Sequence, residues 1–277
     1  MPGQDYDAII QAALREDMPL GDVTSESIVP AGAVSEAVIL AKEDGVLAGL
    51  PVARRVFELV DPRVEFAAAS ADGRAVKKGD VLARLKGPTV SLLKAERTAL
   101  NFLQLLSGVA TATRRFVDAA AGTKARILDT RKTTPGLRLL EKHAVRMGGG
   151  TNHRLGLSDM VLIKDNHLRF VGTIAEAVRR ARAAAPAGMK IEVEVTSLDE
   201  LRQALAAGAD IVMLDNMSLE ETREAVAIAA GRVPLEVSGR VTLERVRDIA
   251  AAGVDLISVG ALTHSPRALD ISLEFLS

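Results

Sequence analysis

The chain has 277 residues, of which 48% are apolar and 26% charged, so it can bury a substantial core in one large domain or two moderate ones. It contains no cysteine, which excludes disulfide bonds, Cys-ligated zinc, iron–sulfur clusters and a thiol nucleophile. A net charge of −1, with six Phe, one Tyr and no Trp, makes nucleic acid a poor partner.

A signal peptide begins with a basic stretch that is followed by a long apolar run. The N-terminal segment of this chain has neither feature. No later segment has about eighteen uncharged apolar residues in a row, so we expect no membrane span and a cytoplasmic location. Apolar residues at helical spacing predict a first helix over residues 6–16.

Residues 35–85 alternate short β-like runs with turn signals such as Asp72-Gly73. Within this part, helical periodicity predicts a helix over residues 52–60. A second, long helix is predicted over residues 90–121, with an interruption at Ser107-Gly108. The mixture of short strands and helices indicates an α+β domain.

From residue 124 onward the pattern changes to apolar strands that alternate with amphipathic helices. Repeated βα units require a parallel sheet with right-handed crossovers, which closes as a barrel or opens as a doubly wound sheet. Helix starts are marked by N-cap residues, which are Thr173, Ser197, Ser218 and Thr242.

Polar residues follow several different strands in this second part. A barrel gathers all its strand ends around one mouth, whereas an open sheet binds its ligand at a single switch point. The distribution of polar residues over several strand ends therefore favours a barrel. Only six or seven strands are recognisable, so we expect this barrel to be incomplete. The residues at the strand ends are Asp129, Arg131, Lys132, Lys164, Asp165, Glu194, Asp215, Asn216, Ser238, Gly239 and Gly260.

Basic residues are concentrated between Arg126 and Arg169, where nine Lys and Arg stand against four Asp and Glu. Guanidinium groups bind carboxylates in a bidentate manner and Lys adds a point charge, so a small anion is expected here. A solvated, salt-bridged surface is the alternative, but these charges interrupt apolar strand ends, which favours a site. The predicted anion ligands are Arg131, Lys132, His153, Arg154 and Lys164.

A neighbouring group of charged residues has helical spacing, and for it a surface role and a role at the rim of the site remain equally open. This group comprises Arg138, Lys142, His143 and Arg146. The glycines at 148–150 match neither a dinucleotide fingerprint nor a Walker loop, and the histidines lack metal-ligand spacing.

Three carboxylates fall on predicted strands, at Glu192, Glu194 and Asp215. Buried strands rarely carry carboxylates unless these are paired or bind metal, so Mg²⁺ coordination or ribose hydroxyl binding is expected. Glu192 equally suits a salt bridge to a helix, so Glu194 and Asp215 are favoured.

The last two predicted strands end at Ser238-Gly239 and Gly260, and Thr263 and His264 follow. In a barrel, backbone N–H groups at this position commonly hold a phosphate.

At these residues the chain closely resembles the quinolinate phosphoribosyltransferase family, whose members make nicotinate mononucleotide, pyrophosphate and CO₂ from quinolinate and phosphoribosyl pyrophosphate in de novo NAD synthesis. The segments that carry the resemblance are ALREDMPLGDVTSE, ERTALNFLQLLSGVAT, DTRKTTPG, GGGTNHRLGLSDMVLIKDNH, EVEV, LDNM, EVSG and ISVGALTHS.

The resemblance implies an α/β fold with an N-terminal α/β sandwich-like domain over residues 1–110 and an incomplete, seven-stranded α/β barrel over residues 111–267. The C-terminal residues 268–277 are expected to pack on the first domain. It also implies a homodimer in which each N-terminal domain caps the barrel of the partner.

The family's functional residues can be placed on matching positions of this sequence. Quinolinate carboxylates would bind Arg131, His153, Arg154 and Lys164, together with Arg97 from the partner subunit. Lys132, Glu194 and Asp215 would lie at the phosphoribosyl pyrophosphate and its Mg²⁺, with Glu194 and Asp215 as metal ligands. Phosphate would bind Ser238, Gly239, Gly260 and His264. One departure is Arg240, where many relatives have a second glycine.

Two rival interpretations remain. Nicotinate phosphoribosyltransferase chemistry, or another substrate on the same barrel, would need fewer cations, and the pair Arg131 and Arg154 suits two carboxylates better than one. A lipoyl- or biotinyl-like carrier module over residues 71–88 matches a hairpin pattern, but Lys77 and Lys78 lack the flanking modification motif and the charged strand ends would be unexplained.

Overall fold

The computed structural model describes residues 6–276 and divides into two compact units. The first comprises residues up to 114, residues 134–149 and those from 265 onward, and the second comprises residues 115–133 and 150–264. The segment 134–149, expected within the barrel, therefore lies in the first unit. The close packing there needs a glycine at position 148, since a Cβ on that residue would lie 2.4 Å from the carbonyl oxygen of Ala110.

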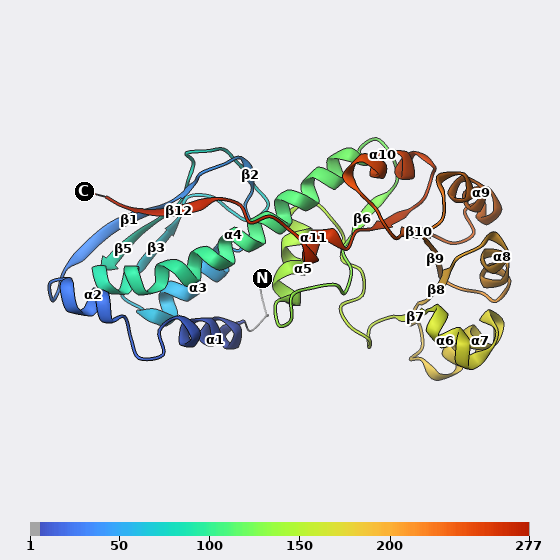
Figure 1. Cartoon of the computed structure of the whole chain (residues 1–277), viewed down its shortest axis with the longest axis horizontal. Helices are drawn as coiled ribbons and strands as arrows, with labels where there is room; N and C mark the ends of the chain where they lie inside the picture. The colour runs from blue at the N-terminus through green and yellow to red at the C-terminus, as the bar shows by residue number, and fades with distance from the viewer. Residues whose placement is uncertain (1–5, 277) are drawn as a thin grey trace. The chain divides into compact units, whose positions relative to one another are not determined.

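The first unit is built on an antiparallel sheet with the strand order β12-β1-β5-β3, and β2 pairs separately with β4. Helices α3 and α4 run along one face of the larger sheet (Figure 1). This is the expected α+β pattern. The elements of this unit are α1 (Asp7–Asp17), α2 (Val23–Ile28), β1 (Val34–Ala41), β2 (Gly45–Val46), α3 (Leu50–Val60), β3 (Glu65–Ala68), β4 (Ala75–Val76), β5 (Val81–Pro88), α4 (Thr89–Ala119, its last residues in the second unit), α5 (Arg138–Met147) and β12 (Ile271–Phe275).

The C-terminal strand completes this sheet, because β12 pairs antiparallel with β1 from Ala41↔Ile271 to Ala37↔Phe275. An interruption of the long helix was predicted at Ser107-Gly108, but helix α4 continues through these residues without a break. Gly108 is needed for close packing instead, since a Cβ there would lie 2.2 Å from the carbonyl oxygen of Arg267.

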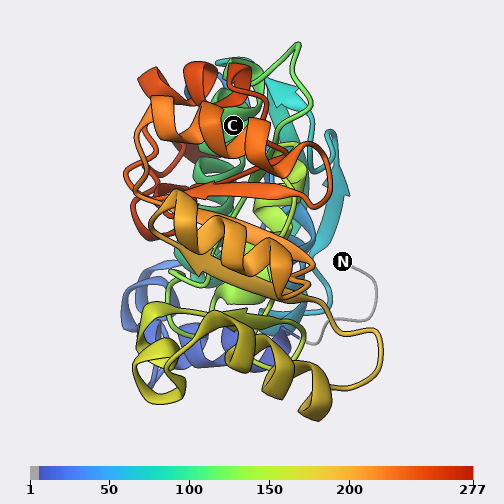
Figure 2. The same cartoon turned by 90° about the vertical axis from the view of Figure 1, so that its right-hand side faces the viewer.

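The second unit is a parallel sheet with helices outside it, which confirms the incomplete α/β barrel (Figures 1 and 2). Within the described residues the order is β6-β11-β10-β9-β8-β7, six strands where seven were expected. The elements are β6 (Arg126–Leu128), β7 (Val161–Ile163), α6 (Asp165–Val171), α7 (Ile174–Ala184), β8 (Ile191–Val195), α8 (Leu198–Ala206), β9 (Ile211–Asp215), α9 (Leu219–Ala229), β10 (Leu235–Ser238), α10 (Leu243–Ala251), β11 (Leu256–Ser258) and α11 (Ala261–His264).

In place of the expected seventh strand, a single residue pairs with β6. Thr151 forms an isolated parallel bridge with Leu128, and its N–H donates to the carbonyl oxygen of Ile127 at 2.8 Å. The pairing stops there because the next residues bond to the side chain of Asp129 instead of a strand backbone.

The predicted helix starts are largely confirmed. The hydroxyl groups of Thr173, Ser197 and Ser218 each accept a hydrogen bond from the backbone N–H three residues later. Thr242 occupies the N-cap of α10 without such a bond. These caps fix where each chain segment leaves the sheet, and so where the strand-end side chains lie.

Leu128, Ile211 and Leu256 form an apolar cluster inside the sheet of the second unit, with Met160 against it. Side chains two residues apart on a strand point to the same face. Polar residues that follow this apolar cluster on the same face therefore lie nearer the carboxyl ends of the strands. Among the described residues, none of the helices has the length and apolar character needed to cross a bilayer.

Candidate active site

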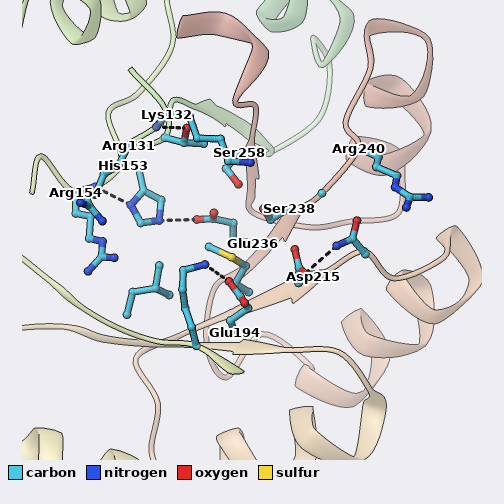
Figure 3. A pocket seen from close by; sticks show the side chains of 16 residues that line it. Arg131, Lys132, His153, Arg154, Glu194, Asp215, Glu236, Ser238, Arg240 and Ser258 are labelled. Atoms are coloured by element: carbon cyan, nitrogen blue, oxygen red, sulfur yellow. Dashed lines mark hydrogen bonds and ion pairs between the residues drawn. The ribbon is translucent and has the colours of Figure 1, made fainter. Parts of the chain in front are cut away.

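A pocket of about 660 Å³ opens at the carboxyl ends of the parallel strands, entirely within the second unit (Figure 3). Its lining includes nine residues that were predicted from the sequence, brought together from six separate strand ends and loops. They are Arg131, Lys132, His153, Arg154, Lys164, Glu194, Asp215, Ser238 and Gly239. The other lining residues are Thr130, Leu162, Met213, Asn216, Glu236, Arg240 and Ser258.

Two predicted phosphate residues lie beside this pocket and outside its lining. A Cβ on Gly260 would lie 3.2 Å from Cδ of Lys132 and 3.2 Å from Cδ2 of His264. The hydroxyl of Thr263 donates to the carbonyl oxygen of Lys132 at 2.7 Å. The end of β11 and helix α11 thus pack against the backbone and stem of Lys132.

Arg97 lies on α4 in the first unit, where its side chain is exposed. It is not part of the pocket lining in the second unit.

Two guanidinium groups occupy one side of the pocket (Figure 3). Burial lowers the pKa of Arg154, and the positive charge of Arg131 lowers it further. One guanidinium nitrogen of Arg154, Nη1, donates to the carbonyl oxygen of Met160 at 3.1 Å, which orients the side chain. Two positive charges that line the same pocket repel each other until an anion binds, so this side of the pocket suits an anionic ligand.

Carboxylates occupy the opposite side. Glu194 lies one residue before the end of β8 and accepts a hydrogen bond from Nζ of Lys164. Asp215 ends β9 and accepts a hydrogen bond from Nδ2 of Asn216 at 2.8 Å. These are hard oxygen donors on adjacent strand ends, which is the kind of site that Mg²⁺ uses when phosphates supply its other ligands. The donor chemistry therefore fits the predicted metal.

Below the mouth lies a buried group that we call the carboxylate–histidine cluster: His153, Glu192 and Glu236. Nε2 of His153 lies 3.1 Å from Oε2 of Glu192 and 3.4 Å from Oε2 of Glu236. The side chains are 8%, 0% and 1% exposed, respectively. Burial lowers the pKa of His153, but the two carboxylates outweigh it and raise the pKa to about 9. Burial raises the pKa of Glu192 to about 7, despite the opposing effect of His153.

The loop after β10 has an unusual backbone. Gly239 has a φ of +91° and Arg240 a φ of +48°, both in the left-handed region. A Cβ on Gly239 would lie 2.3 Å from Oδ1 of Asn216, so another residue would have to displace that side chain as well as adopt a strained φ. The left-handed conformation of residue 240 is one that glycine adopts without strain, so the glycine expected there from the family resemblance would fit this backbone.

Sequence analysis missed Glu236 and gave Glu192 a lower weight. Both lie on strands two residues before a predicted site residue, Glu194 or Ser238, and so share its face. The sequence carries the same signal at Glu236 as at Glu192, a carboxylate inside an apolar strand.

The charged group on α5 was expected either on the surface or at the rim of the site, and neither role holds for all of its members. Lys142 and His143 are buried in the first unit, and Nε2 of His143 lies 2.8 Å from Oδ2 of Asp72. Arg146 is exposed, and none of the group lines the pocket. Burial within the first unit accounts for the two inner side chains.

Comparison with known proteins matches nearly the whole chain to two family models. Residues 22–107 match the quinolinate phosphoribosyl transferase N-terminal domain, and residues 109–274 match the C-terminal domain. The N-terminal match covers the segment 71–88 and leaves the carrier interpretation without support.

Among curated proteins, the probable nicotinate-nucleotide pyrophosphorylase (carboxylating) of Bacillus subtilis is 46% identical over 259 residues, which cover 94% of this chain and 89% of the relative. The crystal structure of NadC from Streptococcus pyogenes has a TM-score of 0.94 and 45% identity, covering 98% of this chain and 97% of that one. Human nicotinic acid phosphoribosyltransferase, at 15% identity and a TM-score of 0.66, shares the fold alone.

Proposed function

Because this chain belongs to the quinolinate phosphoribosyltransferase family, we infer that it converts quinolinate and phosphoribosyl pyrophosphate into nicotinate mononucleotide, pyrophosphate and CO₂, as a step of NAD biosynthesis. The observation that carries this proposal is the pairing of Arg131 with Arg154 beside Lys164 in a pocket whose far side holds carboxylates. Quinolinate brings two adjacent carboxylates, which match two guanidinium groups and an ammonium.

Arg131 and Arg154 are proposed to bind the quinolinate carboxylates, with Lys164 as a third cation. Lys164 is paired with Glu194 in the free protein, so it is available to substrate once Glu194 has another partner. Holding the pyridine ring by its carboxylates fixes the ring nitrogen toward the sugar, which is the orientation effect that lowers the barrier.

The sugar diphosphate is proposed to lie across the strand ends from Lys132 to the β10 loop. Lys132 is oriented by Thr263, and its cation would stabilise negative charge as pyrophosphate leaves the anomeric carbon. Ser238, Gly239, Gly260 and His264 are the proposed phosphate contacts, because a glycine backbone allows close approach of an anion.

Mg²⁺ is the proposed cofactor, held by Glu194 and Asp215 together with oxygens of the sugar diphosphate. When bound, it supplies positive charge that neutralises the leaving diphosphate. In the alternative arrangement, the same two carboxylates accept hydrogen bonds from the ribose hydroxyls.

The reaction needs no general base for the attack on the sugar. The ring nitrogen attacks with its own lone pair, so the N–C bond forms as the bond from the anomeric carbon to pyrophosphate breaks. The positively charged ring then stabilises the carbanion left when the 2-carboxylate departs as CO₂, and that carbon takes up a proton. The pocket residues orient the substrates and stabilise charge.

We further propose that the enzyme is a cytoplasmic homodimer in which Arg97 of each subunit serves the pocket of the other. The exposed position of Arg97 on α4 is compatible with such a role. Mixing Arg97→Ala with Arg131→Ala protein should restore about one quarter of wild-type activity, since half the dimers are mixed and each has one intact site. Absence of recovery after subunit exchange would argue against a shared site.

The activity is tested with purified protein by following pyrophosphate and CO₂ release. Both products should form only when quinolinate, phosphoribosyl pyrophosphate and Mg²⁺ are all present. Equal turnover with nicotinate, which has one carboxylate, would defeat the substrate assignment. Arg202→Ala is a suitable control, because Arg202 is an exposed residue of α8 paired with Asp199.

The metal assignment has its own test by titration calorimetry. Glu194→Gln and Asp215→Asn should weaken Mg²⁺-dependent binding of phosphoribosyl pyrophosphate. Quinolinate binding should stay unchanged in Asp215→Asn and should not weaken in Glu194→Gln, which releases Lys164. Unchanged metal dependence in both variants would reject these ligands.

A further inference from the structure

The loop after β10 brings a cation to a part of the pocket that otherwise lacks one. The other cationic side chains of the lining come from the segment after β6, from the loop after Thr151 and from the residue after β7. Arg240 lines the pocket near the ends of β9 and β10, where the other lining residues are acidic or neutral (Figure 3). A glycine was expected at this position, and the proposed function gives Arg240 no role.

The guanidinium group of Arg240 has no partner within the described part of the chain. The side chain is exposed, and it forms no hydrogen bond or ion pair with another described residue. The carboxylate of Asp215 lines the same pocket, but its hydrogen bond is with Nδ2 of Asn216 at 2.8 Å. Because arginine stays charged at every physiological pH, this part of the pocket presents a positive group that no carboxylate of the described residues contacts.

The backbone of the same loop uses its carbonyl groups inside the protein and leaves N–H groups open. The carbonyl oxygen of Ser238 accepts a hydrogen bond from the N–H of Asn216 at 3.0 Å. The carbonyl oxygen of Arg240 accepts one from Nη1 of Arg245 at 3.2 Å. The N–H groups of Gly239 and Arg240 donate to no described residue. Successive N–H groups in a turn with left-handed residues form an anion-binding concavity, and the side chain of residue 240 begins at this turn.

The anionic groups of the proposed substrates can be matched with the cations of the pocket. The quinolinate carboxylates have two guanidinium groups and an ammonium, and the leaving diphosphate has Lys132 and Mg²⁺. The 5′-phosphate of the sugar has hydroxyl and backbone donors and the imidazole of His264, but no Lys or Arg. A hydrogen bond between charged groups is roughly twice as strong as one between neutral groups. The remaining cation of the lining, Arg240, therefore suits the remaining anion.

We propose that the guanidinium group of Arg240 binds the 5′-phosphate of phosphoribosyl pyrophosphate and keeps this contact with the product, nicotinate mononucleotide. The proposal rests on the proposed function for the identity of the substrate. Figure 3 shows the side chain at the edge of the pocket, beyond Ser238 and Asp215. It reaches the phosphate by a change of rotamer, which an exposed side chain makes within nanoseconds. With glycine at position 240, the same phosphate would have only backbone contacts from this residue.

The first test compares the Michaelis constants of the two substrates in variants of residue 240. Arg240→Ala removes the cation and should raise the KM for phosphoribosyl pyrophosphate about tenfold. Arg240→Lys keeps a charge without the bidentate geometry and should raise it about threefold. The KM for quinolinate should change less than about twofold in both. Arg247→Ala is the matched control, because Arg247 is an exposed residue of α10 outside the pocket lining. An unchanged KM for phosphoribosyl pyrophosphate in Arg240→Ala would overturn the proposal.

The variant Arg240→Gly separates the side chain from the backbone. It removes the guanidinium group but relieves the strain of a left-handed residue. If the guanidinium binds the phosphate, this variant should have as high a KM for phosphoribosyl pyrophosphate as Arg240→Ala. A glycine variant with the wild-type KM would mean that the backbone N–H groups suffice, and the side chain would have no part in binding.

The second test identifies which phosphate is bound, by titration calorimetry with three ligands. Nicotinate mononucleotide carries the 5′-phosphate without a diphosphate, pyrophosphate carries only the leaving group, and nicotinate riboside carries neither. Arg240→Ala should weaken binding of nicotinate mononucleotide about tenfold and change binding of the other two less than about twofold. An equal or larger loss for pyrophosphate would place Arg240 at the leaving group and overturn the assignment.

The dependence on salt gives an independent readout. An exposed ion pair is screened by salt, so the advantage of wild type over Arg240→Ala in binding nicotinate mononucleotide should shrink as sodium chloride is raised. An advantage that does not change with salt would contradict a charge contact. Failure of the proposed function has a different signature, because the wild-type protein would then form no nicotinate mononucleotide from the two substrates. Normal wild-type turnover with unimpaired phosphate binding in Arg240→Ala would reject this inference alone.

Discussion

Oδ1 of Asp129 accepts a hydrogen bond from the backbone N–H of His153 at 2.8 Å, and Oδ2 of the same carboxylate accepts one from Nδ2 of Asn152 at 2.5 Å. Asp129 is fully buried at the end of β6. One carboxylate thus replaces the strand pairing that ends after Thr151 and shapes the loop that carries Arg154.

Asp129→Ala should lower the free energy of unfolding by about 3 kcal/mol, because the side-chain amide of Asn152 and the backbone N–H of His153 both lose a charged acceptor. It should also raise the KM for quinolinate, since the loop is no longer held. Urea denaturation and steady-state kinetics measure both effects. Asp129→Asn keeps one acceptor and should lose less stability. A loss below about 1 kcal/mol in the alanine variant would contradict this role.

Arg131→Ala should weaken quinolinate binding by at least about tenfold, because it removes a guanidinium group that lines the pocket. The melting temperature should change little in comparison, since the side chain is exposed. Calorimetry and thermal denaturation measure the two quantities. Arg131→Lys keeps the charge and should still bind poorly, since an ammonium cannot form a bidentate pair. Normal affinity in the alanine variant would remove Arg131 from the site.

Arg240→Gly should stabilise the protein by about 0.5–1 kcal/mol, because a φ of +48° strains any residue with a Cβ. Arg240→Ala is the matched control: it removes the guanidinium and keeps the Cβ, so it should give no such gain. Chemical denaturation compares the two. An equal gain in both variants would assign the effect to the arginine charge and not to the backbone.

Asp61 should make stability depend on acidic pH. Hydrogen bonds from Arg63, and then from Ser91, hold the pKa of Asp61 well below its usual range. A depressed pKa in the folded state contributes stability above the unfolded value of about 3.9, and this is lost as the pH falls toward the folded value. The free-energy difference between wild type and Asp61→Asn should therefore shrink as the pH is lowered from about 6 to about 3.5. A difference independent of pH would refute this linkage.

Much of the second unit follows from local sequence pattern. Apolar strands, polar strand ends and capped amphipathic helices repeat along the chain, and parallel strands bring all their carboxyl ends to one edge. This is why residues as far apart in sequence as Arg131 and Ser238 were expected in one pocket and line it. Physical pattern placed these residues together, and family resemblance named the substrates.

What the sequence by itself determined, then, was the order of the elements and which side chains stand at strand ends. The tertiary structure alone decided that α5 belongs to the first unit, that α4 continues through Gly108, and that His153 lies between two buried carboxylates. The reason is that periodicity records which face of an element is buried but not what it is buried against. Contacts between residues distant in sequence, such as His153 and Glu236, are set by packing across the barrel interior.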